Sequence, residues 1–184
     1  MTSEEITLTA LSAVEKTGFA YIMVGALAVN CYVFPRATND VDFVLGVPLR
    51  GIDEMAKHLP ADFVIDPQPR MELSTGTYRW IIRVTGSDFL IEVFHLSGDR
   101  HHQEEFTRRR SARLESLGRT IWIPTAEDLV IQKIRWGRTK DLDDARNLLS
   151  VQGAALDMAY IEKWCREHGT LARLEEVRRS IPEI

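Results

Sequence analysis

The feature that most constrains the fold is a glycine that separates a strand from a helix with no linker between them. The apolar run Tyr21–Val24 ends at Gly25, and the stretch Ala26–Tyr32 can continue as a helix. A short apolar run closed by glycine is typical of a buried strand. Glycine lets the backbone pass close to a ligand, and the N-terminus of a following helix offers unpaired N–H groups to an anion. The segment therefore predicts an α/β unit with a phosphate-binding turn, and an ordinary tight turn is the alternative.

Two aspartates stand at the start of the next predicted strand, Val41–Leu45. Asp40 and Asp42 are two residues apart, so strand alternation places both carboxylates on one face and the apolar side chains on the other. Two like charges side by side repel each other unless a positive charge lies between them. Mg²⁺ is commonly held by one or two carboxylates together with substrate phosphates. The pair therefore indicates a divalent metal site, and a solvated strand end is the alternative.

A third carboxylate lies on a later strand. Residues Arg79–Val84 and Phe89–Leu96 read as a hairpin around a polar turn, and Glu92 shares a face with apolar residues of its strand. A carboxylate in an apolar stripe must be paired, protonated or bound to a metal. If this strand lies beside the one that carries the two aspartates, three carboxylates can converge on two cations. The alternative is an edge strand on which Glu92 faces water or pairs with an arginine such as Arg79 or Arg83.

The rest of the chain predicts few further strands and a helical end. Thr125 is the expected N-cap of a long helix, with Asp128 three residues later. The polar stretch His101–Arg113 carries no predicted element. The other expected elements are a strand at Thr120–Ile123 and helices at Ile6–Thr17, Ile52–Leu59, Glu127–Trp136, Asp141–Leu149, Met158–His168 and Leu171–Arg179.

These elements predict an α/β (α+β) fold, a mixed sheet of about four to five strands flanked by helices with a C-terminal helical extension. The expected division is a core at residues 1–125 and a helical region at 126–184 packed on it. A chain of 184 residues with a net charge of −4 argues against a protein that coats nucleic acid non-specifically. Two distant cysteines, a start without a signal peptide and no long apolar stretch predict a cytoplasmic protein without a membrane partner.

Together, these segments resemble a known enzyme superfamily. Gly25-Ala26, thirteen residues, Asp40-Val-Asp42-Phe and a later strand carboxylate resemble the nucleotidyltransferase pattern. The sequence from Arg36 to Asp42, RATNDVD, is similar to that of the minimal nucleotidyltransferases. The downstream segment PTAEDLVIQKIRWGRTKDLDDARNLL resembles the AbiEii-like branch. The matching segments span most of residues 20–150, and the resemblance implies a nucleotidyltransferase-like sheet.

The resemblance assigns a role to each matching position. Asp40 and Asp42 would ligate Mg²⁺ or Mn²⁺, and Glu92 would complete one metal site and accept a proton. The positions implied in binding an NTP are Gly25, Ala26, Arg36, Thr38, Lys133, Arg138 and Asp141. A solvated helix face is the alternative for Lys133. Asp143 and Asp144 are interpreted as surface or cap residues.

The implied activity is transfer of an NMP from an NTP to a hydroxyl of RNA, notably tRNA, or of a protein. The setting that the resemblance suggests is a toxin–antitoxin or phage-defence system, with an antitoxin protein as a further partner. Ala26 departs from the usual serine or glycine and has no hydroxyl for a phosphate. A non-catalytic nucleotide-binding or protein-interaction module is therefore the alternative, and a metal-dependent phosphohydrolase is a third hypothesis.

Overall fold

The computed structural model describes residues 1–47 and 51–182, and a mixed six-stranded sheet forms its centre. The order is β1, β2, β6, β5, β3, and β4 pairs with β5. β2 and β6 are parallel, whereas the other pairs are antiparallel. The strand bounds are Tyr21–Val24 (β1), Asp40–Leu45 (β2), Phe63–Ile65 (β3), Arg70–Glu72 (β4), Thr77–Val84 (β5) and Leu90–His95 (β6).

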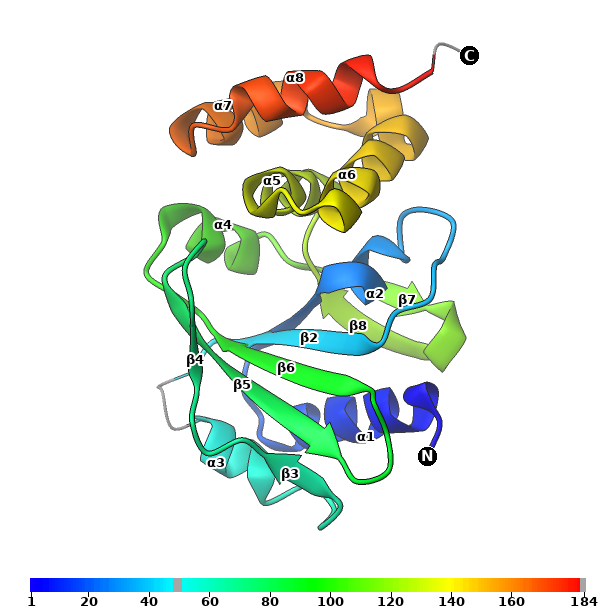
Figure 1. Ribbon diagram of the computed structural model, residues 1–184, viewed down its shortest axis with the longest axis vertical. Helices are drawn as coiled ribbons and strands as arrows, with labels where there is room; N and C mark the ends of the chain where they lie inside the picture. Colours follow the sequence, from blue (N-terminus) through cyan, green and yellow to red (C-terminus); the bar gives the residue numbers. More distant parts are fainter. Residues whose placement is uncertain (48–50, 183–184) are drawn as a thin grey trace.

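Helices cover both faces of this sheet (Figure 1). Helices α1 and α3 lie on one side, and the C-terminal helices lie on the other. The helix bounds are Ser3–Lys16 (α1), Gly25–Val29 (α2), Gly51–Ala56 (α3), Arg100–Thr107 (α4), Ala126–Trp136 (α5), Thr139–Gln152 (α6), Met158–Glu167 (α7) and Leu171–Arg179 (α8), with 3-10 turns at Glu115–Leu117 and Gly153–Ala155. None of the helices in the described ranges is both long and apolar enough to cross a membrane.

The two faces of the sheet differ in character because strand residues alternate. On β2, Val41 and Phe43 belong to the large core that also contains Ile6 of α1. The opposite face carries only a small apolar cluster, which includes Val44 of β2 and Phe94 of β6. That face is left available for charged side chains, since Asp42 and Glu92 share it with these residues by alternation.

The polar stretch His101–Arg113, for which no element was predicted, lies in a helix, α4, and a strand, β7 (Arg110–Leu114). α4 begins after Asp99, whose carboxylate accepts a hydrogen bond from the His102 backbone N–H at 3.0 Å. It is followed by a two-stranded ribbon, β7 and β8 (Arg119–Ile123). The two arginines that mask the strand pattern of β7, Arg110 and Arg113, are both exposed. The edge strands β3 and β4 were also not predicted. Each is only three residues long and partly exposed, so neither has a clear apolar pattern.

Helix α5 begins at the predicted N-cap, and side-chain hydrogen bonds tie α5 and α6 to the segment that follows β1. Thr125 caps α5 by accepting a hydrogen bond from the Asp128 N–H at 3.2 Å. The Tyr32 hydroxyl donates to the Pro124 carbonyl at 2.7 Å, and Gln152 donates to the Tyr32 carbonyl at 2.6 Å. These contacts hold α5 and α6 against the segment that follows β1.

The buried histidine His102 gives the fold a dependence on pH. Its ring Nδ1 accepts a hydrogen bond from the Ser97 N–H at 3.2 Å, and burial lowers its pKa to about 4. The unfolded chain binds a proton near pH 6.5, so it binds more protons than the folded chain between pH 6.5 and 4. We expect the free energy of unfolding to fall in this window as the pH falls, by roughly 1.4 kcal/mol per pH unit from this group.

The measurement is urea unfolding at a series of pH values between 6.5 and 4, in wild type and in His102→Asn. Asparagine can accept the Ser97 hydrogen bond and does not titrate. The variant should therefore show a flatter dependence on pH. An identical slope in the two proteins would exclude His102 as the source.

Candidate active site

Gly25 is required at the end of β1 for two reasons. Its φ of +68° lies in the left-handed region that favours glycine. A Cβ at this position would also lie 1.9 Å from the Asp42 Oδ2 atom, because Val24 is the direct partner of Asp42 in the β1–β2 pairing. The glycine turn and the acidic strand are therefore one packed unit.

Asp40, Asp42 and Glu92 line one pocket, and the strands that carry them are neighbours, which the metal hypothesis requires; the metal site itself stays a prediction. β2 and β6 are adjacent and parallel, and Asp42 is the direct partner of Glu92. Burial, together with the negative charges of Asp40 and Glu92, raises the pKa of Asp42 to about 8. The edge-strand alternative for Glu92 is wrong, since β6 lies between β2 and β5.

Two of these carboxylates are bonded to protein donors. The Thr38 hydroxyl donates to Asp40, and Arg79 donates to Glu92 at 2.9 Å, which is the arginine pairing considered for Glu92. Within residues 1–47 and 51–182, no group of three His, Cys, Asp or Glu side chains is arranged to hold a metal ion. The chemistry of the donor set nevertheless fits a divalent cation, because three carboxylates gather where burial and mutual repulsion disfavour negative charge.

Cationic side chains surround the carboxylates. Lys133 is only 5% exposed, so the solvated helix face proposed as its alternative is wrong. Its Nζ lies 3.2 Å from Asp141 and 2.8 Å from Asp144. The pocket that contains the carboxylates is lined by Gly25, Ala26, Arg36, Asp40, Asp42, Glu92, Lys133, Trp136, Arg138 and Lys140.

Two of the predicted nucleotide-binding residues, Thr38 and Asp141, do not line this pocket. Thr38 braces Asp40 through its hydroxyl. Asp141 is fully buried, and its carboxylate accepts hydrogen bonds from Lys133 and Arg138. A buried carboxylate that is paired with two cations is not accessible to a nucleotide. The direct nucleotide-binding role expected for Asp141 is therefore wrong, and its carboxylate instead holds Lys133 and Arg138. The interpretation of Asp144 as a surface or cap residue is also wrong, because it is 1% exposed and bonded to Arg36.

Sequence reasoning also missed residues that line the pocket. Trp136 follows Lys133 by three positions on α5, a spacing that places both on one helix face. Lys140 follows Arg138 by two positions at the start of α6. The helical spacing was the signal available for Trp136, whereas nothing in the local sequence distinguishes Lys140 from a surface lysine.

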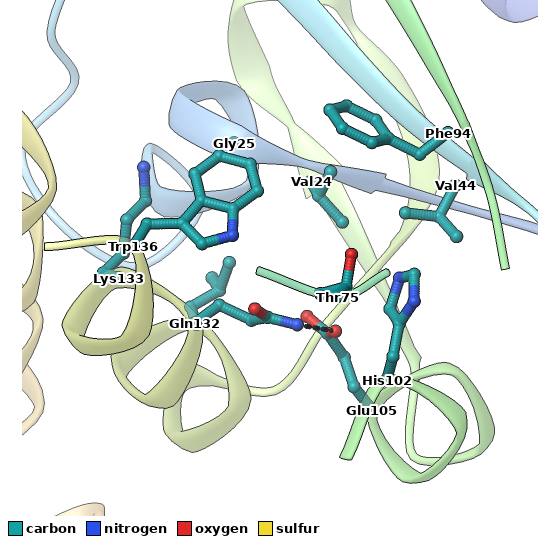
Figure 2. Close-up of a pocket in the computed structure, with 11 residues that line it drawn as sticks. Val24, Gly25, Val44, Thr75, Phe94, His102, Glu105, Gln132, Lys133 and Trp136 are labelled. Atoms are coloured by element: carbon teal, nitrogen blue, oxygen red, sulfur yellow. Dashed lines mark hydrogen bonds between the residues drawn. The ribbon is translucent and has the colours of Figure 1, made fainter. Parts of the chain in front are cut away.

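Figure 2 shows a second pocket, which is lined largely by apolar side chains. It measures about 40 Å³ and shares Gly25, Lys133 and Trp136 with the carboxylate pocket. At one side Gln132 of α5 donates to Glu105 of α4 at 2.7 Å, and burial raises the pKa of Glu105 well above its ordinary value. Lys133 therefore lies between two pockets of different character. The second pocket is largely apolar, and the carboxylate pocket is lined by many charged side chains.

Comparisons with known proteins agree with this architecture. No protein-family model matches the sequence, and no curated protein does so either. Among solved structures, the solution structure of the antibiotic-resistance factor ANT(2'')-Ia has a TM-score of 0.58 at 12% identity and covers 96% of each chain. The crystal structure of ANT(2'')-Ia in complex with adenylyl-2''-tobramycin has a TM-score of 0.59 at 12% identity, covering 92% of this chain and 98% of that chain.

At 12% identity this likeness concerns the fold. The AbiEii-like branch stays a prediction. The likeness extends over 92–96% of this chain. The chain therefore has a nucleotidyltransferase-like fold, with a mixed six-stranded sheet flanked by helices.

Proposed function

We propose that this protein is a metal-dependent nucleotidyltransferase that moves an NMP from an NTP to an acceptor hydroxyl. The observation that carries the proposal is the register of β2 and β6, which sets Asp42 directly beside Glu92 at the end of the glycine turn. Arginine and lysine side chains line the same pocket. Carboxylates for metal next to cations for phosphate are the arrangement that phosphoryl transfer requires.

Each group has a task in this proposal. Asp40, Asp42 and Glu92 would hold Mg²⁺ or Mn²⁺, which when bound offsets phosphate charge and lowers the pKa of a hydroxyl. Lys133, Arg36 and Arg138 would contact phosphate oxygens, as would the backbone of Gly25 and Ala26. A new bond forms between the acceptor oxygen and the α-phosphorus as the bond to pyrophosphate breaks, and Glu92 accepts the hydroxyl proton.

The finer part of the proposal concerns the acceptor. We propose RNA, notably tRNA, or a protein, in a toxin–antitoxin or phage-defence setting with an antitoxin as partner. The cytoplasm, where NTP and Mg²⁺ are abundant, is the compartment that suits this reaction. We also propose that residues 126–184 form the region that selects the acceptor, since α5 supplies Lys133 and Trp136 to the pocket.

A small-molecule hydroxyl is the second candidate acceptor. It is favoured by the likeness to ANT(2'')-Ia, which was crystallised with adenylyl-2''-tobramycin and of which this chain matches 98%. The match extends over 92% of this chain, so the overall fold leaves room for the same kind of acceptor. The non-catalytic module remains the alternative to any transfer, since Ala26 provides no hydroxyl.

The test is a transfer assay with each of the four NTPs labelled at the α-phosphate, in Mg²⁺. Separate reactions contain total tRNA, a protein extract and tobramycin, and pyrophosphate release is followed in each. We expect label in one acceptor class with equal pyrophosphate release. Binding of NTP without transfer would favour the non-catalytic nucleotide-binding module, and phosphate release without labelling would favour a phosphohydrolase. Absence of NTP binding would overturn the proposed transfer and leave the protein-interaction module.

A further inference from the structure

Asp144 links two cations that are far apart in the sequence. Its side chain on α6 is 2% exposed and accepts two hydrogen bonds from the Arg36 guanidinium, Nε at 2.7 Å and Nη2 at 2.8 Å. The same carboxylate lies 2.8 Å from the Nζ of Lys133 on α5. One buried anion therefore fixes a loop residue and a helix residue that both line the carboxylate pocket.

Asp141, one helical turn earlier, extends the arrangement. It accepts hydrogen bonds from Lys133 at 3.2 Å and from Arg138 Nε at 2.6 Å. Burial acts to raise the pKa of each aspartate, but the hydrogen bonds from these cations outweigh it and the pKa of each lies below its ordinary value. Two ionised aspartates of α6 thus bind three cations that line the carboxylate pocket, namely Arg36, Lys133 and Arg138.

The placement of these anions matters because the cations have a competing set of partners. Long arginine and lysine side chains are flexible, and unrestrained they would pair with the nearest carboxylates. In this pocket those are Asp40, Asp42 and Glu92, which the proposed function needs for metal. Asp144 does not line this pocket, and by binding Arg36 and Lys133 it keeps these cations away from the three carboxylates. Both cations then stay in the pocket wall, where the phosphates of a nucleotide can reach them.

We propose that Asp144 is a positioning residue that acts through Arg36 and Lys133 to create a polyphosphate-binding wall beside the metal-binding carboxylates. This inference rests on the proposed function. It predicts that Asp144 contributes to the affinity for the β- and γ-phosphates of a nucleotide and contributes little to the affinity for the nucleoside monophosphate. A purely structural ion pair would affect both ligands alike.

The experiment compares Asp144→Asn with Asp143→Asn, a matched control whose side chain is 55% exposed and pairs with Arg146 at the surface. Affinities for AMP, ADP and ATP are measured by calorimetry in Mg²⁺, after thermal unfolding has established that each variant is folded. We expect Asp144→Asn to weaken ATP binding roughly 10- to 100-fold, as loss of an outer-shell partner does elsewhere. Its AMP affinity should change by less than about twofold, and Asp143→Asn should match wild type.

Loss of a buried anion beside Lys133 can unfold a protein. Asp144→Glu is therefore a second variant, since it keeps the charge and displaces the carboxylate by one methylene. Folded Asp144→Glu should also lose ATP affinity more than AMP affinity. In either variant, an equal loss for AMP and ATP, or no loss, overturns the inference and leaves the proposed function standing. A wild type that binds none of the four NTPs overturns both, and one that binds another base is tested with the mono-, di- and triphosphate of that base.

Discussion

Replacing Asp42 by asparagine is expected to reduce nucleotide transfer by about 10³-fold or more while leaving the protein folded. The asparagine side chain has the same shape as aspartate but no negative charge for a cation, so the charge stabilisation that drives phosphoryl transfer is lost. Asp42 is only 7% exposed and lies close to two like charges, Asp40 and Glu92. Because its raised pKa leaves Asp42 largely protonated at pH 7 without a bound cation, a neutral amide replaces a neutral carboxyl, and metal-free Asp42→Asn should unfold at a temperature no lower than wild type.

The two measurements are the labelled-NTP assay at saturating substrate and thermal unfolding without divalent cations. Asp53→Asn, on the exposed surface of α3, is the matched control and should keep wild-type activity. Transfer within about tenfold of wild type in Asp42→Asn would be incompatible with the proposed role of the carboxylates. Loss of activity together with a large loss of stability would instead show that Asp42 is needed for folding.

The second large effect is expected on stability, at Asp128→Ala. The Asp128 side chain is fully buried and joins three helices, because it accepts hydrogen bonds from His101 of α4 at 3.2 Å and from Tyr160 of α7 at 2.7 Å. Thr125 and Arg108 donate to its other oxygen at 2.7 and 3.2 Å. Removing the acceptor leaves buried donors and a cation unpaired, and we expect a loss of about 3–5 kcal/mol in the free energy of unfolding.

Urea unfolding at pH 7 measures this loss. Tyr160→Phe removes one of the hydrogen bonds and should cost about 1 kcal/mol. Glu127→Ala changes the neighbouring acid on α5, whose carboxylate accepts a single backbone hydrogen bond from Asp157, and should cost no more than that. A loss below about 1 kcal/mol in Asp128→Ala would mean that water replaces the missing carboxylate.

Local patterns predicted most of the elements that build the site. The apolar run before Gly25, the alternation through Asp40 and Asp42, and the Thr125 cap all correspond to observed features. Each depends on residues within one helix or strand, where periodicity and capping act directly. α4 and β7 were missed because their arginines and histidines break the apolar pattern, and their stability comes from partners such as β8.

The sequence by itself determined the chemistry that is available, namely two carboxylates on one face of a strand and a glycine turn before them. The tertiary structure decided which charges meet. It placed Glu92 beside Asp42 through strand order, and it buried Asp144 against Arg36, which is 108 positions earlier. A charged residue on a helix reads as a surface residue unless its partner is known, because burial of a charge is tolerated only when an opposite charge from elsewhere in the chain is packed against it.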